Sequence, residues 1–260
     1  MKIKYLLVVF IALGISSCRW GGFQKQLKDT ISYHYKTLKE FVTNCDSKLD
    51  SNCVAETFSY PIFKDQKMLN YSIIRKLTFL ITFGDTSDST LKKTTKIFLI
   101  DFKDFKQNPK YSVYYRSNIY TKILRQDSSL ITLQIICKSH ANGEQIANYN
   151  NFINWNTKAD KSIVLNDILI NGYQEKLRQL AEKIFRKEEK LGDTVMLPFP
   201  KYMLKGGHFS LNDNFSITPK GIRFFYNEYE IKQSSTDIFI PYKQIKSLLR
   251  RNTVVTQYIK

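Results

Sequence analysis

The sequence predicts an α+β fold of two small subdomains, each an antiparallel sheet packed with helices. Alternating stretches rich in Tyr, Phe, Val and Thr occur in both halves of the chain and predict strands. Apolar residues spaced three or four positions apart mark a smaller number of helices. These elements follow no strict strand–helix–strand rhythm, which argues against a parallel α/β sheet.

The N-terminus has the pattern of an export signal. Lys2 and Lys4 precede the apolar run Tyr5–Ile15, which is too short to cross a hydrocarbon core of about 30 Å. No later segment has the roughly 18 uncharged apolar residues of a membrane-spanning helix. The predicted organisation is a signal peptide at 1–17, a tether at 18–29, an N-terminal domain at 30–110 and a C-terminal domain at 111–260.

The end of that signal resembles a bacterial lipobox. Ile15, Ser16 and Ser17 precede Cys18, and the resemblance implies that Cys18 becomes the first mature residue and carries a lipid. An ordinary secretory signal with a chance cysteine is the alternative. Arg19, in place of an aspartate, favours an outer-membrane protein of the cell envelope that faces the periplasm.

The bonding state of the other three cysteines is predicted from the oxidising compartment that export implies. Cys45 and Cys53 lie eight positions apart, and a local disulfide is the favoured interpretation. A metal pair is the alternative, although no His or further Cys lies nearby in sequence. Cys137 is predicted to be a buried free thiol in a strand.

In the N-terminal half, Thr30–Asn44 can be interpreted as a strand or as a helix, and its many strand formers favour a strand. The next strand, within "VAETFSYPIF", is expected to stop at Pro61. Helical spacing of Leu and Ile predicts a helix over Met68–Phe83, and aromatic residues on one side predict another over Leu91–Lys106.

In the C-terminal half, a β-hairpin is predicted over 111–139, with its turn at "DSS", and strands continue through "ANYNNFINWNT" and "KSIVL". The clearest helix is expected within 166–192, ending at Gly192. Short strands follow around the Pro219–Gly221 turn and in "TDIFIPY", and a short helix is expected over 242–251.

The segments "SITPKGIRFFYN" and "YEIKQSSTDIFIPYKQIKSLL" resemble the extracytoplasmic domain of RsiV-type anti-sigma factors and many Bacteroidetes lipoproteins. Upstream, "ETFSYPIF" and "LNYSIIRKL" resemble the domain that precedes it, which also accompanies some peptidoglycan deacetylases. Some anti-sigma relatives bind lysozyme, so the resemblance implies an envelope-binding role. This chain has "SHANGEQ", with His140, where the family often carries a Gly-Gly-Ala-His-like loop, and it lacks deacetylase metal motifs.

The charge favours anionic partners. The formal net charge is +17, and removal of residues 1–17, which contain Lys2 and Lys4, leaves +15. Such a protein attracts anionic lipid surfaces and wall polymers. The positive charges are spread along the chain without a long basic block, and export also argues against nucleic acid, so we expect no nucleic-acid partner.

The sequence contains no catalytic constellation, and we expect no metal and no cofactor. His34, His140 and His208 are scattered without zinc spacing, and nucleotide-binding and nucleophile-elbow motifs are absent. His208 follows two glycines that would allow close approach of a ligand. Trp155 is a candidate to stack on a sugar, against the commoner alternative of a core aromatic. Trp155, His140 and His208 are therefore the tentative ligand contacts.

These observations predict a non-enzymatic, lipid-anchored envelope protein. It would be a binding module for peptidoglycan or another anionic wall glycan, or for an envelope or lysozyme-like protein. The alternative is a hydrolase that acts on a cell-wall glycan through an Asp/Glu pair. Glu230 is expected to have a structural role in its sheet; the candidate carboxylates are Asp160, Asp167, Glu228 and Glu230.

Overall fold

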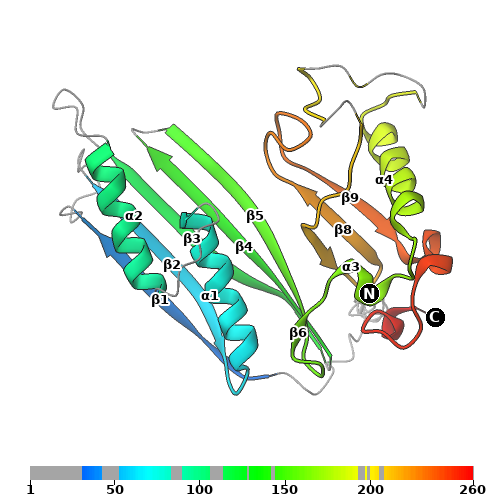
Figure 1. Ribbon diagram of the computed structural model, residues 1–260, viewed down its shortest axis with the longest axis horizontal. Helices are drawn as coiled ribbons and strands as arrows, with labels where there is room; N and C mark the ends of the chain where they lie inside the picture. The colour runs from blue at the N-terminus through cyan, green and yellow to red at the C-terminus, as the bar shows by residue number, and fades with distance from the viewer. Residues whose placement is uncertain are drawn as a thin grey trace, which may run out of the picture.

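The computed structural model describes residues 31–42, 53–82, 90–105, 114–127, 129–141, 144–192, 197, 200–204 and 208–259. Its two sheets each pack with helices, which confirms the predicted α+β class (Figure 1). The first sheet has six strands in the order β1-β2-β3-β4-β5-β6, and the second has three in the order β7-β8-β9. No helix among the described residues is long and apolar enough to cross a membrane.

The first four elements lie close to their predicted positions: β1 (Tyr33–Phe41), β2 (Val54–Phe63), α1 (Lys67–Thr82) and α2 (Leu91–Phe105). The expectation that Pro61 ends its strand is wrong, because β2 continues for two more residues. Pro61 lies opposite Tyr35 of β1 and beyond the Ser59–Tyr120 pair where β2 and β3 stop pairing. Its missing N–H therefore costs no hydrogen bond on the β3 side.

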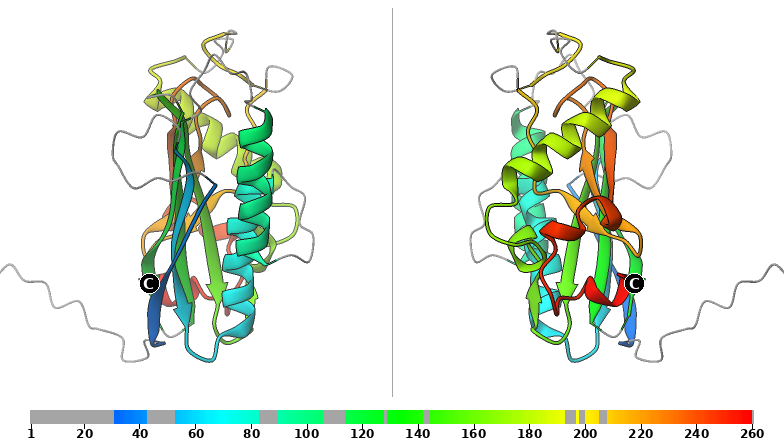
Figure 2. Two further views of the ribbon diagram at one scale, coloured as in Figure 1. Left: turned by 90° about the vertical axis from the view of Figure 1, so that its left-hand side faces the viewer. Right: turned by 90° about the vertical axis from the view of Figure 1, so that its right-hand side faces the viewer.

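The remaining strands of the first sheet are β3 (Tyr115–Gln126), β4 (Leu130–Ala141), β5 (Glu144–Asn156) and β6 (Lys161–Ser162). All neighbours pair antiparallel except β2 and β3, which are parallel, so this sheet is mixed rather than purely antiparallel. The chain passes from β2 to β3 through α1 and α2, and both helices lie on one face of the sheet (Figure 2).

The predicted domain boundary at residue 110 does not coincide with the division between the sheets. It falls inside the connection from α2 to β3, and the strands on either side pair with each other. One hydrophobic core also joins the two sides: Phe58 of β2, Leu77 of α1 and Trp155 of β5 belong to the same cluster. The sheets instead separate after β6.

The second unit contains α3 (Leu165–Ile168), α4 (Gln174–Glu188), β7 (Phe215–Ile217), β8 (Gly221–Tyr226) and β9 (Thr236–Pro241). The helix predicted within 166–192 is divided in two, because the chain turns at Gly172, where φ is +79°. The prediction of one short helix over 242–251 is wrong. The chain forms 3₁₀ turns over Tyr242–Gln244 and Lys246–Leu248, and another over Thr256–Tyr258.

Helix α4 buries one stripe against the three-stranded sheet. Leu177, Ala181 and Phe185 are completely buried, and the ring of Phe185 stacks on Phe209 with centroids 5.5 Å apart. The ring of Tyr202 meets Phe185 edge-on. This apolar stripe, on a helix whose other faces are charged, holds the second unit together.

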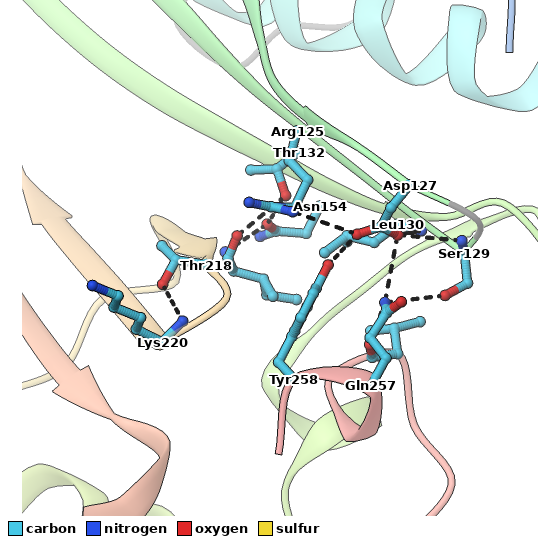
Figure 3. A network of polar contacts seen from close by, with 12 residues as sticks. Arg125, Asp127, Ser129, Leu130, Thr132, Asn154, Thr218, Lys220, Gln257 and Tyr258 are labelled. Carbon is cyan, nitrogen blue, oxygen red and sulfur yellow. Dashed lines mark hydrogen bonds and ion pairs between the residues drawn. The ribbon is translucent and has the colours of Figure 1, made fainter. Parts of the chain in front are cut away.

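The C-terminus is fastened to the hairpin turn between β3 and β4 (Figure 3). Asp127 is 3% exposed, and its carboxylate accepts hydrogen bonds from the backbone N–H of Leu130, the Nε2 of Gln257 and the hydroxyl of Tyr258. Arg125 lies 3.8 Å from the same carboxylate. A buried charge with this many partners ties the last turn to the first sheet.

Cys137 is a buried free thiol in β4, as predicted. Cys53 is completely buried immediately before β2, whereas Cys45 and Cys18 lie outside the described residues. The disulfide between Cys45 and Cys53 and the lipidation of Cys18 therefore stay predictions.

Candidate binding surface

One face of the six-stranded sheet is covered by α1 and α2, and the described elements cover the other only in part (Figure 2). On that second face, β7 contacts β4 and β5. The rest consists of the side chains of β1 to β4 that point away from the helices, which we call the open face. Its position follows from the two-residue period of a strand, because buried Tyr115, Ser117 and Ile119 alternate with more exposed Arg116 and Asn118.

The register of the strands aligns the open face into rows. Lys39 of β1 lies opposite Thr57 of β2, which lies opposite Asn118 of β3, which lies opposite Lys138 of β4. Neighbouring strands are about 4.8 Å apart, so this row spans roughly 14 Å. In the next row, Arg116 lies opposite His140.

The open face is cationic. Lys39, Lys122 and Lys138 are exposed and Arg116 is half-buried, and none of these four forms an ion pair within the described part of the chain. The described side chains on this face include no Asp or Glu; Glu40 of β1 and Glu56 of β2 point to the helix side. Four positive charges therefore have no countercharge among the described side chains of this face, which creates a positive potential over the sheet.

Aromatic rings lie between these cations. The Nζ of Lys122 is 5.5 Å from the ring centroid of Tyr120, and the guanidinium of Arg116 is 5.8 Å from that of Tyr114. Tyr35 donates a hydrogen bond from its hydroxyl to the carbonyl oxygen of Thr121 at 3.0 Å. Partial burial and the neighbouring Tyr33 raise the pKa of Tyr35, so its hydroxyl keeps its proton. The face thus combines aromatic rings with positive charges.

The comparisons with known proteins assign a family model to part of the second unit. Residues 166–243 match DUF3298, a protein family of unknown function. This DUF3298 segment runs from α3 to the 3₁₀ turn after β9. The resemblance to RsiV-type domains and to the deacetylase-associated domain stays a prediction. No curated protein matches the chain.

Two crystal structures share the fold over nearly the whole chain. A DUF3298-family protein from Bacteroides fragilis NCTC 9343 has a TM-score of 0.68 and 20% identity, and the match covers 89% of this chain and 99% of that one. A DUF3298-family protein from Pseudomonas aeruginosa PAO1 has a TM-score of 0.66 and 17% identity, covering 86% and 96%. These likenesses extend beyond the DUF3298 segment to the six-stranded sheet.

The structure places the three tentative ligand contacts in different environments. His140 lies on the open face beside Arg116, whereas His208 is exposed just before Phe209, near α4. Trp155 is 2% exposed in the core under α1 and α2, so it cannot stack on a sugar from solvent. We correct its role to core packing. The three side chains do not form a common site.

Two of the four candidate carboxylates have structural partners. Asp167 is 2.6 Å from the Nζ of Lys161 and accepts the backbone N–H of Val164, and these contacts hold its pKa below the usual range despite some burial. In the DUF3298 segment, Glu230 accepts hydrogen bonds from the amides of Asn212 and Asn227. Asp160 lies in the turn between β5 and β6, and Glu228 in the turn after β8. The described residues contain no group of three His, Cys, Asp or Glu arranged to hold a metal.

The cations of the open face were missed as a site at the level of sequence, although a signal exists. Arg116, Asn118, Tyr120 and Lys122 recur every second residue along β3, which marks the solvent side of a strand. Their alignment with Lys138 follows from the hairpin between β3 and β4. The contribution of Lys39 depends on the parallel pairing of β2 with β3, which local pattern does not predict.

Proposed function

We propose that this protein is a non-enzymatic binding module for an anionic glycan of the cell envelope, which it binds on the open face. The observation that carries this proposal is the row from Lys39 to Lys138, with Arg116 and Lys122 beside it, on a face without described carboxylates. A flat surface with several separated positive charges suits a linear polyanion, which makes many weak contacts at once.

The aromatic residues fit the same ligand. Tyr120 presents its ring beside Lys122, and Tyr35 is exposed on the same face. Sugar rings pack on such aromatic faces while their carboxylate or phosphate groups meet lysines. A lysozyme-like protein fits less well, because lysozymes are basic and a face of this charge repels them at long range. The hydrolase alternative requires two carboxylates across a cleft, and the partners of Asp167 and Glu230 favour structural roles for both.

The experiment is a binding titration with the chain from residue 19 onward, which contains every described residue. Polygalacturonate is the anionic probe, dextran is the neutral one, and lysozyme is included as a basic protein. We expect binding of polygalacturonate that weakens as salt increases, no binding of dextran, and no release of shorter sugars. Equal binding of both polysaccharides, or cleavage of either, would contradict the proposal.

A pair of charge variants localises the binding. Lys122→Gln with Lys138→Gln removes two charges from the open face, and Lys176→Gln with Lys183→Gln removes two from the exposed side of α4. Each exposed ion pair contributes about 0.2–1 kcal/mol, so the first double variant should bind polygalacturonate roughly 2- to 30-fold more weakly. The second should bind like the wild type. Equal losses in both would indicate that only total charge matters.

We also propose that the mature protein is anchored through a lipid on Cys18, in the outer membrane and facing the periplasm. The lipobox-like residues before Cys18 support this location, and the anchor would bring the open face to the envelope polymers. Wild-type protein should incorporate labelled palmitate and partition with membranes. A Cys18→Ala variant that still does both would refute the anchor.

A further inference from the structure

A cavity of about 540 Å³ lies on the opposite side of the same sheet, between α1, α2 and the strands. Its walls are largely apolar, with Leu80 from α1, and Phe98 and Phe102 from α2. Phe79, Ile146 and Tyr149 also line it and are 52%, 54% and 45% exposed. Apolar side chains exposed together at the mouth of an apolar cavity are typical of a ligand site rather than of a closed core.

The wall of the cavity contains a buried carboxyl oxygen that has no hydrogen-bond partner. Glu56 of β2 is 1% exposed, lines the cavity, and its Oε2 has no hydrogen-bond partner. A buried polar atom without a partner costs about 1–3 kcal/mol, so its persistence in a core calls for an explanation. A ligand atom that bonds to Oε2 would remove this cost.

The surroundings of Glu56 determine its charge. Burial is the main cause that raises the pKa of this carboxyl to about 8, and a hydrogen bond with Ser117 only partly opposes it. Ser139 donates a hydrogen bond to Ser117 at 3.1 Å, and the Ser117 hydroxyl keeps its own proton for Glu56, so this pair of hydroxyls supplies the carboxyl with one donor and leaves Oε2 without a partner. At neutral pH the carboxyl is therefore protonated and can both donate and accept a hydrogen bond.

We propose that this cavity binds a mainly apolar small molecule carrying one uncharged hydroxyl- or amide-type group, which hydrogen-bonds to Glu56 while its apolar body packs between the two helices and the sheet. A charged head group fits less well, because it would lose its hydration in an apolar cavity without a charged partner. This site lies on the face opposite the proposed glycan surface and does not depend on it.

Two probes of matched size test the proposal on the chain from residue 19 onward at pH 6, where both probes are uncharged. They are 2-naphthol, which has a hydroxyl, and 2-methylnaphthalene, which has a methyl group in its place. We expect both to bind, with 2-naphthol preferred about 2- to 13-fold, the ratio that one net hydrogen bond provides. If neither probe binds, the proposal is overturned.

Three variants locate the binding. Glu56→Gln keeps an uncharged hydrogen-bonding group and should keep the preference for 2-naphthol, whereas Glu56→Leu should abolish the preference while still binding 2-methylnaphthalene. Ala147 lines the cavity, so the larger side chain of Ala147→Phe should fill it and weaken the binding of both probes. A preference for 2-naphthol that survives in Glu56→Leu would contradict the role given to Glu56.

A measurement on the wild-type protein avoids dependence on the folding of any variant. Cys137 lines the cavity as a free thiol and is 8% exposed. Saturating 2-naphthol should slow alkylation of Cys137 by iodoacetamide, followed by mass spectrometry of its peptide. An unchanged alkylation rate at a saturating concentration would show that the probe binds elsewhere and would overturn the proposed location.

Discussion

The side chain of Asn154 in β5 pairs with the backbone of Ile217 in β7 as a strand residue would. Its Oδ1 accepts the N–H of Ile217 at 2.9 Å, and its Nδ2 donates to the carbonyl of Phe215 at 2.8 Å. Asn214 and Asn227 reproduce the arrangement from the other side, since their amides bond to the backbone of Asn150. Asparagine amides thus join the two sheets where no continuous ladder does.

We predict that Asn154→Ala destabilises the protein substantially. Asn154 is 4% exposed, and its loss leaves the N–H of Ile217 and the carbonyl of Phe215 buried without partners. The free energy of unfolding should fall by about 2–4 kcal/mol, measured by denaturant titration. Asn148→Ala, on the same strand but outside this junction, should change it by less than about 0.5 kcal/mol. If both variants lower the free energy of unfolding equally, Asn154 does not stabilise the junction between the two sheets.

The fastening of the C-terminus can be tested at Tyr258. Tyr258→Phe removes the hydroxyl that bonds to the buried carboxylate of Asp127 (Figure 3). A hydrogen bond to a charged group contributes about 1.5–3 kcal/mol, and the unfolding free energy should fall by that amount. Tyr229→Phe, at a side chain that is 62% exposed, is the matched control and should be neutral. A neutral Tyr258→Phe would show that the last turn is held by other contacts.

The stability of the protein should depend on pH through Glu56. Its pKa rises from 4.5 when unfolded to about 8 when folded, so the folded state binds more protons between these values. This contribution is fully present below about pH 4.5 and is lost as the pH rises to about 8. Thermal unfolding should show wild type losing more stability than Glu56→Gln between pH 5 and pH 9.

The other titratable groups near Glu56 do not produce the same dependence. Tyr115 and Cys137 face it and have raised pKa values, mainly through burial, so both stay neutral over most of this range. Glu40, across from Glu56 on β1, lies within 3.8 Å of Lys92 and Lys96. If Glu56→Gln shows the same loss of stability as the wild type, the dependence arises from another group.

Two glycines differ in why they are required. A Cβ on Gly221 would collide with the carbonyl oxygen of Ile240 on β9, so Gly221→Ala should cost about 2–3 kcal/mol. A Cβ on Gly172 meets nothing within 4 Å, but the backbone φ at this position is +79°, which is strained for any residue other than glycine. Gly172→Ala should therefore lower the free energy of unfolding by about 1 kcal/mol. Denaturant titrations of both variants compare them. A smaller loss at Gly221 would contradict the close approach of β8 and β9.

Local sequence patterns predicted individual elements well and their assembly poorly. The start of β2 and the bounds of α1 and α2 follow closely from alternation and helical spacing, because these patterns report which face of an element is buried. They do not report which strand lies next to which. The parallel pairing of β2 with β3 therefore went unpredicted, and with it the single sheet that crosses residue 110.

The sites depend on the same long-range pairing. Lys39 and Lys138 are about 100 positions apart in sequence and share a row only through three strand pairings. Glu56 gives no signal in sequence, since an acidic residue in an alternating strand is expected to face solvent. Its burial becomes visible only when α2 covers β2. Trp155 was predicted as a ligand contact, with a core role as the alternative, and the structure places it in the core.

The most direct test of glycan binding on the open face is a lysine footprint. Exposed lysines are acetylated with and without saturating polygalacturonate, and the modified peptides are quantified by mass spectrometry. The proposal predicts that the polymer protects Lys39, Lys122 and Lys138, while Lys176 and Lys183 on α4 react as in its absence. Protection of the α4 lysines instead, or equal protection of all five, would contradict it.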